Sequence, residues 1–326
     1  MICINRCICA TTVVGVLALT SFFAAAQGNY PNRSIRMVVP FAPGGGTDIV
    51  GRLLADSLGP ALGTSIVVDN RPGGGSTVGT AIVAKATPDG YTTLLNTLDL
   101  AVSPALHKNL PYDPLRDFIT VSLVAEQPNL LVVHPSLSAK TLKEFSAHVR
   151  ATPGKLTYGS SGLGSTTQLA TALLLMSIQG NMIHVPYKGI GPAVTAMLGN
   201  ETTALISTFA SALPHVKGGR LRALGVTSLS RASLLPDVPT IAETEVPGYE
   251  FTVWYGFVVP AGTPRAIVDR LNKEIVAQLN IVTVQQRFEA QGLTVTPSTS
   301  AQYLVKLKAE AEKWAKAARG AKIEPQ

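Results

Sequence analysis

The stretch IRMVVPFAPGGGTD, residues 35–48, shows most clearly the strand, turn and helix pattern that recurs along the chain. Residues 35–39 are mostly apolar and β-branched, as in a buried strand. Residues 47–61 then place apolar side chains at helical spacing, with Ile49, Val50, Leu53, Leu54 and Leu58 on one face. A strand, a glycine-rich turn and a helix in this order are typical of a parallel sheet covered by helices on both faces. We therefore predict an α/β fold.

The same alternation continues along the chain. We predict further strands at 65–69, 92–96, 119–125, 129–134, 156–158, 182–185, 203–207, 223–227 and 251–259, and further helices at 76–86, 141–151, 165–179, 190–198, 209–217, 264–280, 283–291 and 298–319. No low-complexity linker separates two halves. The chain changes from one domain to the other near 119–134 and returns over 225–252. This organisation predicts two α/β domains, residues 27–124 plus 251–326 and residues 125–250, with a ligand cleft between them.

Residues 1–26 have the pattern of a secretory signal. Arg6 precedes an apolar stretch at 8–23, and three alanines at 24–26 fit a cleavage site. We predict cleavage after Ala26 and a periplasmic mature chain; the alternative is an uncleaved membrane anchor, for which the stretch is short. All three cysteines lie at positions 3, 7 and 9, so the mature chain would have no disulfide and no thiolate chemistry.

The composition excludes some classes of protein. Hydrophobic residues make up 46% of the 326 residues and charged residues 14%, which is not the composition of a disordered chain. The net charge of +7 comes from 27 basic and 20 acidic residues that are scattered, and the basic residues of the last helix alternate with acids. Such a helix face is usually solvated. With aromatic residues at only 6%, we expect no nucleic-acid partner.

Three glycine-rich turns, at 40–48, 71–77 and 158–166, each follow a predicted strand. A glycine loop that opens a helix presents free backbone N–H groups and the positive end of the helix dipole, which together form a cradle for an anion. The first and third loops also carry hydroxyl side chains, whereas the second fits a tight turn better. Asp48 has two interpretations: it caps its own helix, or it contacts a ligand.

Motifs for cofactors and catalysis are absent from the sequence. A dinucleotide fingerprint would need glycine where Ile49 or Val78 stands, and a phosphate-binding loop would need lysine at Thr80. The five histidines have no metal-binding spacing, and no G-x-S-x-G elbow occurs. We therefore predict no cofactor, no metal and no catalytic residue. An exported hydrolase, which needs a nucleophile and a base, is disfavoured.

Seven motifs appear in order along the chain, and together they resemble the Bug-type family, the extracytoplasmic solute receptors of tripartite tricarboxylate transporters. The likeness covers about residues 29–320. The motifs are PFAPGGGTD (40–48), VVDNRPG (67–73), ATPDGYT (86–92), LPYDP (110–114), HVPYKG (184–189), LPDVPT (235–240) and PAGTP (260–264).

The resemblance implies a two-domain periplasmic-binding-protein fold of type II-like topology, with two crossover strands. It also implies closure on a small carboxylate, which is a di- or tricarboxylate, an amino acid or an aromatic acid. Delivery to a membrane permease would follow; a receptor for a signalling partner is the alternative, and we expect a monomer. The implied ligand-binding residues are Phe41, Pro43, Gly44, Gly45, Gly46, Thr47, Asp48, Ser160, Ser161, Gly162, Gly164, Ser165, Thr166 and Ser207.

The chain also departs from the family pattern, mostly in the second domain. Gln168 stands where the family usually has histidine, and Ala172 where it usually has glutamate. Ala196, Thr203 and Ser207 stand where acids are common. In the first domain Gly51 replaces a usual alanine. These differences predict a less negative second half of the cleft, which would favour an anionic ligand or tolerate an unusual one.

Overall fold

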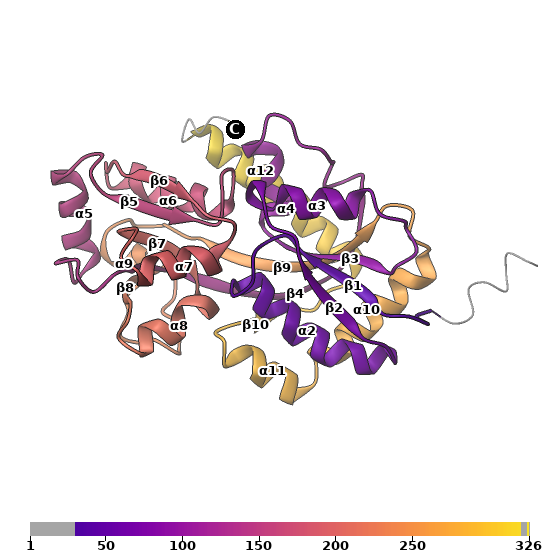
Figure 1. Cartoon of the computed structure of the whole chain (residues 1–326). Coiled ribbons are helices and arrows are strands. Elements are labelled where there is room, and N and C mark those ends of the chain that lie inside the picture. Colours follow the sequence, from indigo (N-terminus) through magenta and orange to yellow (C-terminus); the bar gives the residue numbers. More distant parts are fainter. Residues whose placement is uncertain (1–29, 321–324, 326) are drawn as a thin grey trace, which may run out of the picture.

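The computed structural model describes residues 30–320 and residue 325 (Figure 1), so the predicted signal and its cleavage site lie outside the described residues. The described strands form one sheet in the order β2-β1-β3-β9-β4-β7-β5-β6, and β10 and β8 also pair with β4. Figure 1 shows two groups of elements on either side of the middle of this sheet, which we call the first and second lobes.

The first lobe is built on three parallel strands. The three parallel strands are β1 (Ile35–Val39), β2 (Ile66–Asn70) and β3 (Thr92–Thr97). The lobe also contains the short strand β10 (Thr294–Val295). The helices of the lobe are α2 (Gly46–Leu62), α3 (Thr77–Ala84), α4 (Asp99–Leu106), α10 (Arg265–Leu279), α11 (Val282–Glu289) and α12 (Ser300–Gly320), with the 3₁₀ turn η2 (Gly74–Ser76) before α3. Helix α2 buries Val50, Leu54 and Leu58 of the predicted apolar face, whereas Ile49 and Leu53 of that face are only partly buried.

The second lobe repeats this plan with shorter strands. Its strands are β5 (Thr157–Ser160), β6 (Ile183–Pro186), β7 (Ala204–Thr208) and β8 (Arg222–Val226), of which the first three are mutually parallel. Its helices are α5 (Leu142–Ala151), α6 (Thr166–Ser177), α7 (Ile190–Leu198), α8 (Phe209–Lys217) and α9 (Ile241–Thr244). A separate apolar cluster, which includes Leu205 and Phe209, forms part of the core of this lobe.

Two long strands connect the lobes, β4 (Phe118–Val133) and β9 (Thr252–Pro260). Residues 118–128 of β4 pair with β9, and residues 129–133 pair with β7 and β8. In Figure 1 both strands run through the middle of the molecule. The prediction of separate strands at 119–125 and 129–134 was wrong, because backbone pairing with β9 continues through the polar residues and Pro128.

The central strands also correct the expectation of purely parallel sheets. Strand β9 is antiparallel to β3 and β4, and β4 is antiparallel to β7, β8 and β10. Parallel pairing is confined to β1–β3 and β5–β7, where helices return the chain to the same edge. The carboxyl ends of these parallel strands carry the loops that meet between the lobes.

The sequence analysis missed α4, α9 and β10. Helix α4 spans eight residues and contains Pro104, so its helical periodicity is weak. Its position matters for function, because it directly follows β3 and begins at Asp99.

Candidate functional site

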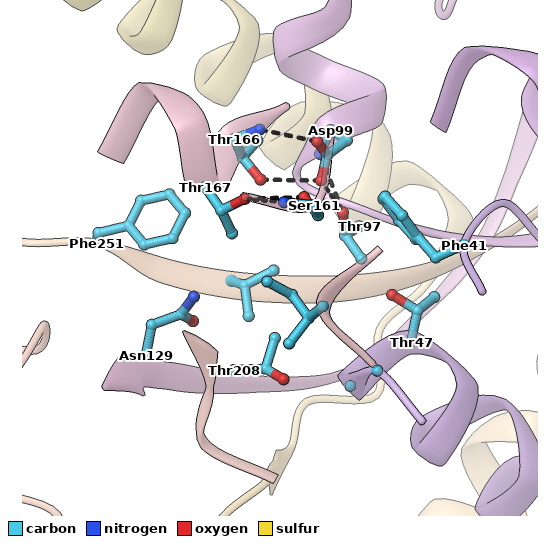
Figure 2. A pocket seen from close by; sticks show the side chains of 14 residues that line it. Phe41, Thr47, Thr97, Asp99, Asn129, Ser161, Thr166, Thr167, Thr208 and Phe251 are labelled. Atoms are coloured by element: carbon cyan, nitrogen blue, oxygen red, sulfur yellow. Dashed lines mark hydrogen bonds between the residues drawn. The ribbon is translucent and has the colours of Figure 1, made fainter. Parts of the chain in front are cut away.

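A cavity of about 30 Å³ lies between the lobes at the carboxyl ends of the parallel strands. By volume it holds about two water molecules, so the lobes are closed tightly around it. Figure 2 shows the side chains that surround it. The lining residues are Phe41, Gly45, Gly46, Thr47, Thr97, Asp99, Asn129, Ser161, Thr166, Thr167, Ile190, Thr208, Phe251 and Val253.

The amino-terminal end of α2 faces the cavity from the first lobe. Gly45 precedes the helix, and among the described residues no side chain caps it. The first-turn amides of α2 are therefore free to donate to a ligand, and the helix dipole favours a negative charge there. No residue with a side chain fits at position 46, because a Cβ atom there would overlap the buried hydroxyl of Tyr255 and lie 2.9 Å from the Gln127 amide nitrogen.

Asp48 stabilises the loop that leads into α2. Its carboxylate accepts hydrogen bonds from the Gly44 amide at 3.1 Å, from Arg52 at 3.0 and 3.1 Å, and from the Asn70 amide at 3.1 Å. Burial alone would raise the pKa of Asp48, but these hydrogen bonds and the Arg52 charge together lower it. Asp48 is therefore an ionised residue that holds the loop in place and does not line the cavity.

The amino-terminal end of α6 faces the cavity from the second lobe, and two of its three first-turn amides, those of Thr166 and Gln168, already have partners. The Ser165 hydroxyl caps the helix by accepting from the Gln168 amide, and Gln168 in turn accepts from the Gly164 amide at 2.7 Å. The amide of Thr166, the first residue of α6, donates to the Asp99 carboxylate at 2.9 Å. A side chain of the first lobe thus occupies the anion-binding end of this helix.

Asp99 is buried and accepts three hydrogen bonds. Besides the Thr166 amide, the hydroxyls of Thr166 and Thr97 donate to its second oxygen at 2.9 and 2.5 Å, and Figure 2 shows this group above the cavity. Burial raises the pKa of Asp99 despite these three donors. No ion pair among the described residues includes Asp99.

Asn129 is a buried lining residue whose side chain has no hydrogen-bond partner within the described residues. It lies on β4 at the change from one lobe to the other, its side chain is fully buried, and neither its amide nitrogen nor its amide oxygen has a partner within the described residues. Unsatisfied buried amides are costly, so such a group is expected to meet a ligand or water. Phe41, Ile190 and Phe251 give the cavity apolar walls around it.

Direct contacts hold the lobes together beside the cavity. The Ala42 amide donates to the Lys188 carbonyl at 2.9 Å, and the Ser211 hydroxyl donates to the Gly44 carbonyl at 3.1 Å. Gly191 of α7 approaches the loop so closely that a Cβ atom would overlap the Pro43 carbonyl oxygen. The described conformation is therefore the closed one, and glycine at 191 permits it.

Comparison with known proteins agrees with this architecture. Residues 50–320 match the model of the tripartite tricarboxylate transporter family receptor. The chain belongs to this receptor family. The receptor is 38% identical to Protein BugT of Bordetella pertussis over 317 residues, which cover 95% of this chain and 97% of BugT. It is also 38% identical over 303 residues to the UPF0065 protein in the tcbD-tcbE intergenic region of Pseudomonas sp. strain P51, which covers 92% of this chain and 90% of that protein.

Solved structures give the same result. The receptor superposes on the solved structure of R. palustris Rpa4515 with adipate at a TM-score of 0.88. The two chains are 34% identical, and the match covers 91% of this chain and 100% of that chain. For MatC of Rhodopseudomonas palustris with bound malate the TM-score is 0.85, at 31% identity and with 88% and 99% covered. The predicted family and the periplasmic-binding-protein fold are thereby confirmed. Within residues 30–320 no helix is both long and apolar enough to cross a membrane.

The structure of the receptor divides the fourteen predicted ligand-binding residues into three groups. Six line the cavity: Phe41, Gly45, Gly46, Thr47, Ser161 and Thr166. Pro43 and Gly44 lie instead along an outer groove beside Gly191. The six that line neither are Asp48, Ser160, Gly162, Gly164, Ser165 and Ser207.

Several of these residues support the cavity from behind. The Ser160 hydroxyl lies 2.6 Å from His184 Nε2, and His184 stacks on Tyr158, where burial lowers its pKa to about 4. The buried Ser207 hydroxyl donates to the neighbouring Thr208 carbonyl at 3.2 Å, and Thr208 lines the cavity in its place. Among the departures from the family pattern, Gln168 helps to cap α6, and none lines the cavity.

Sequence reasoning missed eight lining residues: Thr97, Asp99, Asn129, Thr167, Ile190, Thr208, Phe251 and Val253. Thr97 and Asp99 could have been found from their position, because polar residues directly after a parallel strand lie at the ligand edge of the sheet. Thr208, the last residue of β7, lies at the same edge of the sheet. Within the described residues, no cluster of three histidine, cysteine, aspartate or glutamate side chains could hold a metal.

Proposed function

We propose that this receptor captures a small carboxylate in the periplasm by closing its two lobes over it. The observation that carries the proposal is the uncapped amino-terminal end of α2: Gly45, Gly46 and Thr47 line the cavity together with Asn129, whose side chain has no hydrogen-bond partner within the described residues. Free N–H groups at a helix end bind anions well, most of all where water is excluded. Relatives solved with adipate and malate support a carboxylate as the ligand.

The proposed mechanism is a shift between open and closed populations. The cavity is smaller than an organic acid, so the lobes must separate to admit one, and they close on it less tightly than in the described conformation. We assign residues 27–124 plus 251–326 to one moving domain and residues 125–250 to the other. Close to these boundaries β4 changes its partner from β9 to β7 between Pro128 and Asn129, and β9 begins at Thr252. Capture needs no bond to be made or broken, and the protein acts as a binding protein, not an enzyme.

The receptor would deliver its ligand to a permease of the tripartite tricarboxylate type, as a monomer exported by its signal. Cleavage after Ala26 predicts that the mature chain begins at Gln27. Amino-terminal sequencing of protein purified from the periplasm tests this step. A chain that still begins at residue 1 would contradict it.

The carboxylate assignment is tested by a thermal-shift screen of the mature chain. The panel holds mono- and dicarboxylates, amino acids, neutral sugars and simple amines. A ligand at a hundred times its Kd stabilises the folded state by about 2.7 kcal/mol, so a hit raises the Tm by several degrees. Stabilisation by compounds that carry a carboxylate supports the proposal. Stabilisation only by sugars or by amines without a carboxylate would overturn it.

A further inference from the structure

The cavity has opposite polarity at its two sides. On one side are the free amides at the start of α2, beside Thr47. On the other side is Asp99, and Figure 2 shows it and Thr47 across the cavity from each other. Asp99 is the only titratable side chain among the lining residues, and no lysine, arginine or histidine lines the cavity.

The hydrogen bonds of Asp99 leave room for one more donor. A carboxylate accepts about four hydrogen bonds. One oxygen of Asp99 accepts from both the Thr97 and Thr166 hydroxyls, whereas the other accepts only from the Thr166 amide. The remaining acceptor site belongs to a buried group that lines the cavity and has no counter-ion in the described chain.

We propose that Asp99 determines ligand specificity by binding a donor group, above all an ammonium, at the end of the ligand opposite its carboxylate. This inference rests on the proposed function, since it takes the α2 amides as the site of the ligand carboxylate. The ligand class is therefore a short acid with one carboxylate and one cationic or neutral donor end, such as an amino acid. A second carboxylate at that end would face Asp99 in a water-poor site, where like charges repel strongly.

Asn129 fits the same ligand class. Its side-chain amide offers one acceptor and two donors, all unpartnered, so it can bind either polar end of a zwitterion that lies across the cavity. A ligand that is apolar between its two ends would also suit the walls formed by Phe41, Ile190 and Phe251.

The experiment compares acids of matched length by calorimetry on the mature wild-type chain. The pairs are malonate with 3-aminopropanoate, succinate with 4-aminobutanoate, and glutarate with 5-aminopentanoate. We expect the amino acid of the best-binding pair to bind at least about tenfold more tightly than its dicarboxylate partner. Equal or tighter binding of the dicarboxylate would overturn the inference and leave the proposed function intact. Binding of no carboxylate at all would overturn both.

The role of Asp99 itself is tested with Asp99→Asn, which keeps an acceptor for the Thr166 amide and removes the charge. The amino acid should lose at least about tenfold in affinity, and the dicarboxylate should gain. Asp56→Asn is the matched control, because Asp56 is an exposed acid of the same lobe, paired with Arg287; it should change neither affinity. An unchanged preference in Asp99→Asn would mean that Asp99 only connects the lobes.

Discussion

The two helices that point at the cavity, α2 and α6, differ in how their first turns are satisfied. Both follow a parallel strand and a loop that contains glycine and hydroxyl residues. Helix α6 is capped by Ser165 and its first amide is bound by Asp99 from the other lobe. Helix α2 has no side-chain cap. A loop's glycine content therefore does not show where an anion binds; the count of free amides does.

This difference assigns distinct tasks to the lobes. The first lobe supplies both the free amides of α2 and the Asp99 carboxylate, so it can bind both ends of a ligand. The second lobe contributes hydroxyls, the apolar wall at Ile190, and the contacts that keep the cavity closed. We therefore expect the α2 amides to determine affinity for the carboxylate, while the α6 loop mainly stabilises closure.

The largest effect should come from preventing closure. Gly191→Ala adds a methyl group that overlaps the Pro43 carbonyl oxygen in the closed state only. Alanine is favourable in a helix, so each lobe should fold normally. We expect carboxylate affinity to fall by about a hundredfold or more, which is roughly 3 kcal/mol taken from the closed state. Calorimetry measures the loss, and circular dichroism checks the fold.

A control for this substitution lies at the other end of α7. Gly199→Ala places its Cβ atom 3.4 Å or more from every neighbour, which is an ordinary contact, so affinity should remain within about twofold of wild type. If Gly191→Ala binds as well as Gly199→Ala does, the lobes do not need the described close approach, and the closure mechanism fails.

A smaller effect is expected from making α2 resemble α6. Gly45→Asp gives α2 a capping carboxylate at its N-cap position, where a Cβ atom lies 3.5 Å or more from its neighbours. The new side chain would bind the amides that we assign to the ligand. Affinity for a carboxylate should fall about tenfold, while the Tm of the free protein stays the same or rises. Thermal unfolding with and without ligand measures both.

The reverse change in α6 is the matched control for Gly45→Asp. Ser165→Ala removes the existing cap and should lower stability by about 1 kcal/mol, with less than threefold loss of affinity. Should Ser165→Ala lose more affinity than Gly45→Asp, the anion would bind at α6, and the difference between the two helices would have the opposite meaning.

How far the sequence predicted this site depends on which contacts are local. The loop at 40–48 was predicted correctly as a strand, turn and helix, because glycines and apolar periodicity act within a few residues. Phe41, Gly45, Gly46 and Thr47 line the cavity as a result. The role of Asp48 matches neither of its two interpretations: it does not cap α2 and does not line the cavity, but accepts from the Gly44 amide, Arg52 and Asn70 and so holds the preceding loop in place.

The rest of the site depends on pairings between distant parts of the chain. Asp99 reaches Thr166 across 67 positions, and a short helix with weak periodicity presents it. Asn129 lines the cavity because β4 continues from one lobe to the other, a pairing that its own sequence does not indicate. Occupation of α6 by a carboxylate of the other lobe can be seen only when both are placed together.

The smallest effect concerns how the free energy of unfolding depends on pH through the buried Asp99 carboxyl group. Burial raises the pKa of Asp99, so the folded state binds its proton more tightly than the unfolded state does. The contribution of Asp99 to stability is thus fully present below its ordinary pKa of about 4 and is lost as pH rises through the raised value. Asp99→Asn does not titrate there. It should be at least as stable as wild type at pH 7, and the difference between them should shrink or reverse as pH falls towards 4.

Urea unfolding of both chains between pH 4 and pH 7 measures this difference. Burial also lowers the pKa of half-buried His107, and the nearby Asp99 charge raises it. Asp99→Asn should therefore lower the pKa of His107 further, which destabilises this variant as pH falls and adds to the expected shrinking of the difference. Asp56→Asn again serves as the control and should follow wild type at every pH. A difference that grows as pH falls would show that the Asp99 carboxylate is stabilised in its charged form. Its charge would then be satisfied within the protein, and it would not need a donor from the ligand.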